Sequence, residues 1–270
     1  MTHQIAVYGK GGIGKSTVSS HVSVALALSG STVLLVGCDP KADSTFSLLG
    51  GRTPPSILDL VSARVPNDDL LERAVMEGYA GVLCCEAGGP EPGIGCAGRG
   101  IIVAIESLGA AGAFEALGVD HVVYDVPGDV VCGGFAMPMR KGFAEEVYIV
   151  TSPEYASLYA ANNIARGVRR FSSSGGAMMG GIIANMRSGD DALGPVSRVA
   201  EALSSRLSAT VPWDPCLPRS ERRGTTLFES GKQGATTEAY VTLAEAIRRP
   251  MPTVPTPLKR DALRALCQGG

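Results

Sequence analysis

The segment 9–17 (GKGGIGKST) has the residue types and spacing of a phosphate-binding loop. Its glycines allow consecutive backbone N–H groups to turn toward a phosphate, and a helix that starts near Lys15 adds its positive N-terminal end. We expect Lys15 to reach the β- and γ-phosphates and Ser16 to hold Mg²⁺. The pattern predicts a MgATP-type site to which the whole segment contributes: Gly9, Lys10, Gly11, Gly12, Ile13, Gly14, Lys15, Ser16 and Thr17.

Carboxylates follow two further predicted strands. Asp125 ends the apolar run 121–125 and has the position of a Walker B carboxylate, which holds Mg²⁺ or its water. Asp129 lies four residues further on and could orient or deprotonate the attacking water. Asp39 and Asp43 follow the strand 32–36 and are suited to sensing Mg²⁺ and the γ-phosphate. The alternative for Asp39 and Asp43 is that they belong to a solvated polar turn without a role at the nucleotide.

Two cysteines, Cys96 and Cys132, lie in glycine-rich segments, each before a predicted helix. Local N–H groups could stabilise a thiolate or a cluster sulfide there, and the glycines leave room for a bulky inorganic group. Two ligands per chain do not complete a [4Fe–4S] cluster, but a two-fold dimer supplies four. From the residues alone, two buried thiols in tight loops remain the alternative.

Composition limits the other function classes. The 270 residues are 45% hydrophobic and 19% charged, which predicts a compact globular protein. A net charge of −2 predicts no nucleic-acid or membrane partner. No apolar stretch reaches the length of a membrane span and the N-terminus has no signal-peptide pattern, so we expect a cytoplasmic protein. In that reducing compartment the seven cysteines are expected as thiols or metal ligands.

Strands and helices alternate along the chain, which predicts an α/β protein of the P-loop NTPase fold. Its sheet should be mostly parallel, with helices on both faces. We expect one domain over 1–249, then a Pro-rich linker and a short helix over 250–270. The expected strands are 5–8, 32–36, 121–125, 146–151, 181–184 and 209–211. Expected helices follow Lys15 up to Gly30 and cover 56–78 (interrupted near Pro66), 101–117, 155–171, 193–207, 237–249 and 258–267, with a glycine-rich stretch at 80–100.

Taken together, these motifs resemble the nitrogenase iron protein family from residue 4 to about residue 248. The resemblance rests on 9–17, 38–45 (CDPKADST), 88–100 (GGPEPGIGCAGRG), 125–138 (DVPGDVVCGGFAMP) and 159–164 (YAANNI). It implies a homodimer bridged by one [4Fe–4S] cluster on Cys96 and Cys132. Such proteins pass single electrons to a heteromeric catalytic component in steps coupled to MgATP hydrolysis. Ferredoxin or flavodoxin would supply the electrons.

The resemblance also implies roles for individual residues, carried over by position. Lys10 would cross the dimer interface to the partner's phosphates, and Arg99 matches the docking-face arginine that some members modify by ADP-ribosylation. Lys10, Lys15, Asp39 and Asp129 would act in hydrolysis. The nucleotide site would further include Ser16, Lys41, Asp43 and Asp125, with Asn185, Pro212 and Asp214 beside the adenine.

Several departures from the family pattern bear on the partner system. Phe46 stands where dinitrogen-reducing members usually carry Arg and looks more like tetrapyrrole-reducing members, whereas 135–138 and 159–164 look like nitrogenase. Pro127 and Pro218 are also unusual. This mosaic favours a nitrogenase-like paralogue, with methylthio-alkane reductase first. The alternatives within the family are nitrogenase itself and the protochlorophyllide, chlorophyllide or Ni-sirohydrochlorin reductases. Two alternatives come from another class: a partition-type ATPase and an iron–sulfur carrier ATPase. Such carriers typically use a C-x-x-C pair, which this chain does not have.

Overall fold

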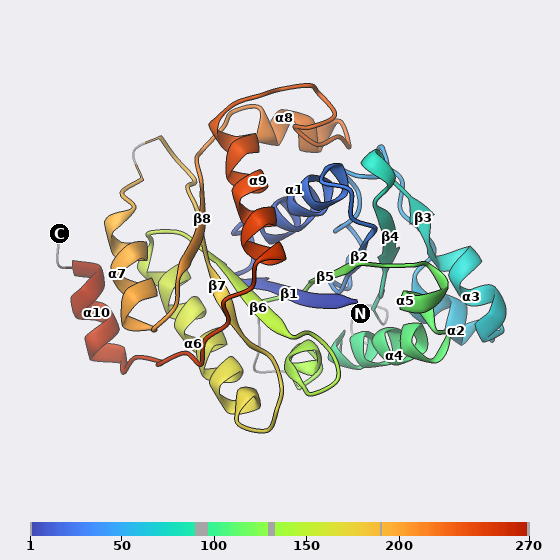
Figure 1. The fold of residues 1–270 in the computed structure, drawn as a ribbon, viewed down its shortest axis with the longest axis horizontal. Coiled ribbons are helices and arrows are strands. Elements are labelled where there is room, and N and C mark those ends of the chain that lie inside the picture. Colours follow the sequence, from blue (N-terminus) through green and yellow to red (C-terminus); the bar gives the residue numbers. More distant parts are fainter. Residues whose placement is uncertain (1, 90–96, 129–132, 190, 269–270) are drawn as a thin grey trace.

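A computed structural model describes residues 2–89, 97–128, 133–189 and 191–268. In these ranges, eight strands form one sheet in the order β3-β4-β2-β5-β1-β6-β7-β8 (Figure 1). Only the β3–β4 pair is antiparallel, which confirms the expected mostly parallel sheet. The strands are β1 (His3–Gly9), β2 (Val33–Gly37), β3 (Met76–Glu77), β4 (Leu83–Glu86), β5 (His121–Asp125), β6 (Glu146–Thr151), β7 (Met178–Asn185) and β8 (Leu207–Val211).

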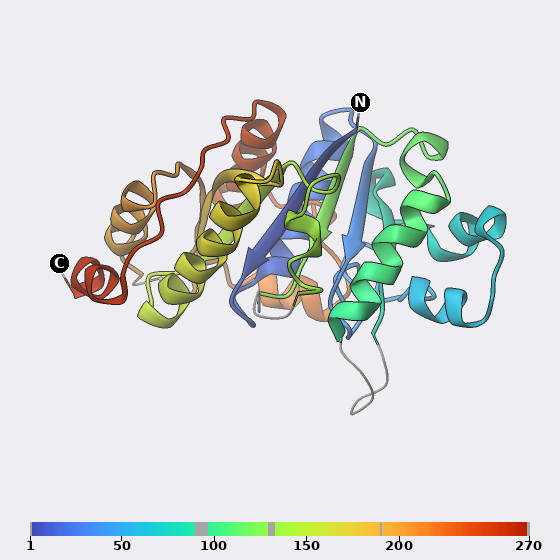
Figure 2. The same ribbon diagram turned by 90° about the horizontal axis from the view of Figure 1, so that it is seen from below.

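Helices cover both faces of this sheet, as Figure 2 shows edge-on. Alternate residues of β1 point to opposite faces, so Ile5 and Val7 belong to one apolar cluster and Ala6 and Tyr8 to the other. The first face packs on α1 (Lys15–Leu28) and α9 (Ala235–Arg248). The opposite face packs on α4 (Ala97–Ala110), α6 (Tyr155–Ser172), α7 (Gly194–Ala202) and α10 (Arg260–Gln268).

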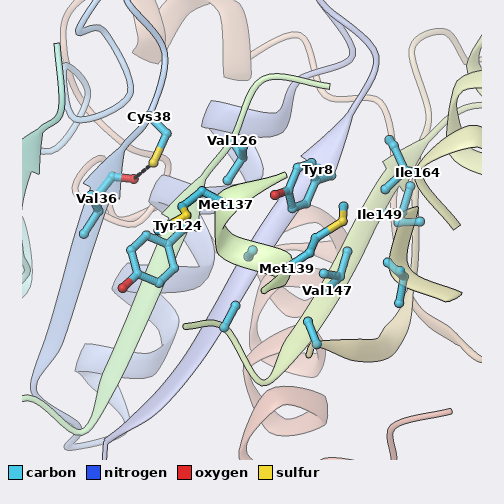
Figure 3. Close-up of a cluster of buried hydrophobic side chains, with 14 of the residues drawn as sticks. Tyr8, Val36, Cys38, Tyr124, Val126, Met137, Met139, Val147, Ile149 and Ile164 are labelled. Carbon is cyan, nitrogen blue, oxygen red and sulfur yellow. Dashed lines mark hydrogen bonds between the residues drawn. The ribbon is translucent and has the colours of Figure 1, made fainter. Parts of the chain in front are cut away.

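The core of the second face lies over the middle of the sheet (Figure 3). Tyr8, Tyr124 and Met139 pack there between the central strands and the 3₁₀ turn η2 (Met137–Met139), and all three are fully buried. Tyr8 stays polar at its tip, because its hydroxyl donates to the carbonyl of Phe135 at 2.7 Å. Burying a tyrosine ring while pairing its hydroxyl avoids the cost of an unsatisfied polar group.

Smaller helices complete the layer beside α4. α2 (Ile57–Ser62) and α3 (Asn67–Ala74) lie on either side of Pro66, and α5 (Ala113–Ala116) follows α4. Ser56 caps α2 by accepting a hydrogen bond from the Asp59 N–H at 3.1 Å. The helical part of the expected stretch 56–78 ends at Ala74, and Met76–Glu77 form the short strand β3 instead. A 3₁₀ turn, η1 (Tyr79–Gly81), leads from β3 into β4.

Four further differences from the sequence-based expectation concern missed elements and helix bounds. β4 lies inside the stretch expected only as a glycine-rich loop, and α8 (Leu217–Arg222) has no counterpart among the expected helices. The helix expected over 193–207 ends at Ala202, because Ser204 takes a left-handed backbone conformation (φ 56°) and the chain turns into β8. The helix expected over 101–117 starts earlier and is divided into α4 and α5.

Residues 250–268 run back over the body as what we call the C-terminal strap. Thr253 forms an antiparallel bridge with Met179, and the side-chain amide of Asn162 bonds both backbone groups of Leu258, at 2.7 and 3.0 Å. α10 then packs on α6 and α7 through the fully buried Leu263. Among the described helices, none has the length and apolar character needed to cross a bilayer.

Candidate nucleotide site

The phosphate-binding loop connects the central strand β1 to α1 at the carboxyl edge of the sheet. Gly12 and Gly14 adopt left-handed φ values of 72° and 93°, which L side chains rarely take. The loop is also closed on itself, since the Ile13 N–H donates to the Lys10 carbonyl at 3.1 Å. From β7, the Asn185 Nδ2 donates to the Ile13 carbonyl at 2.7 Å. These two bonds hold the loop in its turned conformation.

A cavity of about 380 Å³ opens over this loop. Its volume falls in the range of small-molecule sites. Most of the residues expected at the nucleotide line it: Gly11, Gly12, Ile13, Gly14, Lys15, Ser16, Thr17, Asp39, Lys41, Asp43, Asn185 and Asp214. The structure thus brings together segments from the ends of four strands at one concave surface, the usual position of ligand sites in open α/β sheets.

Asp125 lies beneath the loop. It is buried, and the Ser19 hydroxyl donates to its Oδ1 at 3.3 Å. Burial raises the pKa of Asp125, while a hydrogen bond from Ser16 and the charge of Lys15 oppose that shift. A carboxylate beside the Ser16 hydroxyl is suited to holding a cation through that serine or its water. Lys15, also buried, supplies positive charge at the same point.

The segment after β2 forms the wall opposite α1. The Asp39 carboxylate accepts the Lys41 N–H at 3.1 Å, which folds the segment into a tight turn. Asp39 is half-buried, whereas Lys41 and Asp43 are exposed, and all three line the cavity. Thr45 fixes the end of this turn, since its N–H and hydroxyl both donate to Glu86 Oε1 at 2.8 Å.

Besides Asp125, which lies beneath the loop, three residues expected at the nucleotide do not line the cavity. Gly9 packs against the Val150 carbonyl so closely that a side chain could not fit. Lys10 is exposed, and Pro212 is half-buried beyond the end of β8. The position of Lys10 outside its own cavity is compatible with a lysine that serves another subunit.

Asp214 is already engaged within the chain. The ammonium of Lys232 lies 2.6 and 2.7 Å from its two carboxylate oxygens, and the Cys216 N–H and Thr236 hydroxyl also donate to it. Burial raises the pKa of Asp214, but the bonds from Lys232 and Cys216 outweigh it and lower the pKa below its usual value. The carboxylate therefore organises the loop before α8.

Sequence reasoning missed several residues of the cavity wall. Arg187 donates from Nη1 to the Gly12 carbonyl, and Trp213 is 48% exposed at the rim. These two and the remaining wall residues come from the segments after β7 and β8: Met186, Arg187, Trp213, Leu217, Pro218 and Glu221. In the sequence, Pro218 stands out only as an unusual residue. Trp213 lies directly between the expected Pro212 and Asp214, a proximity in sequence that could have drawn attention to it.

The segment after β5 is anchored to the phosphate-binding loop. Gly128 packs directly on the Gly9 carbonyl, and a Cβ added at Gly128 would lie 3.1 Å from the Lys10 nitrogen. At its far end, Phe135 accepts the hydrogen bond from Tyr8. Residues 128 and 135 are thus both attached to the end of β1. Asp129 and Cys132, which lie between them in sequence, are outside the described residues.

The start of α4 meets this same segment. Gly134 packs on the backbone of Gly98, which leaves no room for a side chain at Gly134. Gly98 is two residues after Cys96 in the sequence, and Gly134 is two residues after Cys132. Cys96 also lies outside the described residues. Arg99 is exposed in the first turn of α4.

The described cysteines have different surroundings. Cys38 and Cys85 are fully buried, and burial raises the pKa of both thiols, with nearby carboxylates including Glu86 adding to the shift. The same cause raises the pKa of Cys84. Thiols of this kind stay protonated and do not ligate metal readily. Within the described ranges, no three His, Cys, Asp or Glu side chains are placed to hold a metal ion.

A family model for "4Fe-4S iron sulfur cluster binding proteins, NifH/frxC family" matches residues 3–269. The chain belongs to the NifH/frxC family. Members of this family are ATP-hydrolysing electron-transfer proteins that bind a [4Fe–4S] cluster and function as homodimers with a catalytic partner. The match covers nearly the whole chain, including both cysteine segments and the strap, so it extends past the residue-248 limit of the motif resemblance.

Solved structures of other ATPases share the fold. The Pyrococcus furiosus cell division ATPase MinD is 25% identical, with a TM-score of 0.70 over 92% of this chain and 99% of that one. A ParA family ATPase from Chlorobium tepidum is 19% identical, with a TM-score of 0.69 over 91% and 99%. Cobyrinic acid a,c-diamide synthase from Mycobacterium smegmatis, solved with an ATP analog and magnesium, is 20% identical, with a TM-score of 0.64 over 92% and 95%. These similarities confirm the P-loop NTPase fold of this NifH/frxC-family chain.

Proposed function

We propose that this chain is the reductase component of a nitrogenase-like system. A homodimer would carry one [4Fe–4S] cluster and deliver single low-potential electrons to a heteromeric catalytic component, driven by MgATP hydrolysis. The observation that carries the proposal is a pair of backbone contacts, one at the phosphate-binding loop and one between the two cysteine-bearing segments. Gly128 packs on Gly9, and Gly134 packs on Gly98, so both cysteine-bearing segments are attached to the nucleotide site.

The residues around the cavity suit a MgATP ligand. Lys15 and the loop N–H groups would hold the phosphates, Ser16 would ligate Mg²⁺, and Asp125 would fix the ion or its water. Asp39, Lys41 and Asp43 would respond to the γ-phosphate from the opposite wall, and Asp129 would orient the attacking water. Exposed Lys10 would complete the site of the other subunit, which would make ATP a ligand shared by two chains.

The cluster would be held by Cys96 and Cys132 from each subunit. Glycines at 98 and 134 let the two backbones approach closely enough for one bridging group, and the buried thiols of Cys38, Cys84 and Cys85 are poor competitors for it. When bound, a [4Fe–4S] cluster supplies one-electron transfer at low potential. Since residues 128 and 135 are attached to β1, a nucleotide-driven shift of that strand's end would be passed to the segment that bears Cys132.

The catalytic partner is proposed from the departures in sequence. Phe46, Pro127 and Pro218 depart from the pattern of the dinitrogen-reducing members, while 135–138 and 159–164 keep it. We propose methylthio-alkane reductase as the partner system, with nitrogenase and the tetrapyrrole reductases as the alternatives. Arg99, exposed at the start of α4, would lie on the docking face. Ferredoxin or flavodoxin would reduce the cluster in the cytoplasm.

The test is iron content and EPR of anaerobically purified, dithionite-reduced protein, with and without MgATP. We expect about four irons per dimer and a signal that nucleotide changes. Cys96→Ala or Cys132→Ala should abolish both. Cys267→Ala, which removes a partly exposed thiol on α10, is the control and should keep them.

One other function has support in the fold. The likeness to MinD and ParA proteins favours a partition-type ATPase without a redox group as the second candidate. An iron-free dimer that still hydrolyses ATP after cluster reconstitution would overturn the reductase proposal and establish this second one. Activity with the purified catalytic components of each candidate system would then identify the partner.

A further inference from the structure

The polar turn that follows β2, residues 39–43, is attached at both ends to β4 and the segment after it; we call it the acidic turn. At its start, Pro40 lies so close to Gly89 that a Cβ on this glycine would overlap the proline ring. Just past its end, the Thr45 N–H and hydroxyl both donate to Glu86 Oε1 at 2.8 Å. A movement of the turn therefore acts on two points of one short segment.

Glu86 is confined on its other side. It is fully buried, and its Oε2 lies against Gly37 at the end of β2, where a Cβ would overlap it. The Ala87 N–H donates to the Gly37 carbonyl at 2.7 Å, which extends the β2–β4 pairing past the last strand residue. One carboxyl oxygen is held by Thr45 and the other is blocked by Gly37, so rotation of the Glu86 side chain cannot absorb a shift of Thr45. The shift is passed to the backbone of β4.

The segment after β4 leads to Cys96. Cys96 itself is outside the described residues, but the described residues before and after it contact each other. A Cβ at Gly100, in the first turn of α4, would lie 3.2 Å from the Gly88 carbonyl oxygen and 3.6 Å from the Gly89 Cα. The two ends of the stretch that contains Cys96 therefore meet beside Pro40.

The acidic turn is also a wall of the nucleotide cavity, which Asp39, Lys41 and Asp43 line. Charged groups at one wall respond to the arrival of a third phosphate and its Mg²⁺, because both ligands carry charge to the same place. The turn thus lies between the ligand and the segment that bears Cys96, and Glu86 is the side chain that joins the two.

We propose that Glu86 is a positioning residue that links the acidic turn to the Cys96-bearing segment, so that a nucleoside triphosphate in the cavity alters the base of that segment. Glu86 does not line the cavity, so it acts through Thr45. This route is separate from the contact between Gly128 and Gly9. The inference deepens the proposed function and rests on it, because it assumes that the cavity binds MgATP.

The test is hydrogen–deuterium exchange of the intact protein, followed by mass spectrometry of peptides that cover 83–89. Exchange is measured without nucleotide, with MgADP and with the magnesium complex of a non-hydrolysable ATP analogue. Calorimetry establishes saturation for each protein. We expect the analogue to change the exchange rate of 83–89 more than MgADP does, and Glu86→Ala to lose this difference while still binding the analogue.

Three further variants separate the link from general destabilisation. Glu86→Gln keeps an acceptor for Thr45 and should keep the response of 83–89. Thr45→Val removes the hydroxyl bond but not the N–H bond, so its response should be intermediate; it also serves if Glu86→Ala does not fold. Glu77→Ala, at an exposed position on neighbouring β3, is the matched control and should respond like the intact protein.

Two results would overturn the link through Glu86. One is an analogue that leaves the exchange of 83–89 unchanged in the intact protein, or changes it equally in Glu86→Ala and Thr45→Val. The other is a Glu86→Gln protein that responds no better than Glu86→Ala. The proposed function fails differently, by absence of MgATP binding or of iron from the intact protein. Because the exchange measurement needs no iron, the two failures are distinguishable.

Discussion

Glu86 is a carboxyl group placed where water does not reach. It ends β4, is fully buried, and uses Oε1 to accept two hydrogen bonds from Thr45. Its Oε2 has no partner within the described residues and packs against Gly37, where any side chain would collide with it. Burial raises its pKa to about 8, and the charges of Asp125 and Asp43 add to the shift while the Thr45 bonds oppose it. At neutral pH the folded protein therefore holds this group mainly as the neutral acid.

Replacing Glu86 by Gln should change how stability depends on pH. Between pH 4.5 and 8 the unfolded chain releases the Glu86 proton and the folded chain keeps it, so the folded state binds more protons and its stability falls as pH rises. The loss over this window is on the order of a few kcal/mol. Glu86→Gln keeps an oxygen for Thr45 but cannot ionise, so its stability should fall less.

The measurement is urea denaturation of both proteins at fixed concentration from pH 5 to pH 8.5. The difference in unfolding free energy between Glu86→Gln and the unmodified protein should grow in favour of the variant as pH rises. Parallel pH profiles for the two proteins would show that Glu86 does not titrate in the way its burial implies.

Residue-level prediction from the sequence worked where one motif encodes a local structure. The loop 9–17 supplies its own backbone geometry, so Lys15, Ser16 and the glycines could be placed from their spacing alone. Trp213, Arg187 and Glu221 were missed because the cavity wall joins segments after β7 and β8 that meet only in the folded sheet. The commitment of Asp214 to Lys232, 18 residues away, is likewise a property of the fold.

At the scale of elements, the segment that follows β5 contacts the end of β1 at two points, residue 128 and residue 135. Gly128 touches the phosphate-binding loop and Phe135 accepts the Tyr8 hydroxyl. Backbone packed on backbone leaves no flexible side chain to absorb a change. A displacement of the backbone at Gly9 is therefore passed to the backbone at Gly128, and the reverse.

Gly128→Ala should separate these two backbones. A methyl group at this position would overlap the Gly9 carbonyl, so the loop or the 125–128 segment must move. Since small displacements of catalytic groups are costly, we expect kcat/KM for ATP to fall by about tenfold or more. Gly133→Ala is the matched control, because a Cβ at Gly133 would meet no atom of the described residues within 4 Å. Equal ATPase activity in the two variants would contradict the coupling argued here.

The elements that could be predicted from the sequence are those with a clear apolar pattern. β5 and β6 were predicted with their observed bounds because both are continuous runs of buried residues. β4 was missed, since four residues with two cysteines inside a glycine-rich stretch carry no periodicity. α8 was missed as well, because its six residues contain a proline and several charges, and only the Pro at its first turn hints at a helix start.

For the whole molecule, the C-terminal strap connects the last residues to the second half of the sheet. Besides the two bonds from Asn162, Arg166 donates to the Leu258 carbonyl at 2.8 Å, and Arg198 donates to the Leu266 carbonyl at 3.0 Å. These partners lie on α6 and α7. These bonds hold the strap against α6 and α7.

Asn162→Ala should loosen this attachment. The change leaves both backbone groups of Leu258 without the amide and should destabilise the fold by about 1–3 kcal/mol. Trypsin should also cut faster after Lys259 and Arg260, which limited proteolysis with mass spectrometry would detect. Asn163→Ala, on the neighbouring half-buried residue, serves as the control. If both variants resist trypsin and urea equally, the amide of Asn162 is not what retains the strap.

The strap has a consequence for how each molecule is made. Chains are synthesised from the N-terminus, so residues 250–268 leave the ribosome after α6 and α7 do. Until then the surface of α6 and α7 that Leu263 later covers stays bare to water. Every newly made chain therefore passes through a stage in which this half of the sheet presents an apolar surface to chaperones and to neighbouring nascent chains, and that stage lasts until 250–268 have been synthesised and docked.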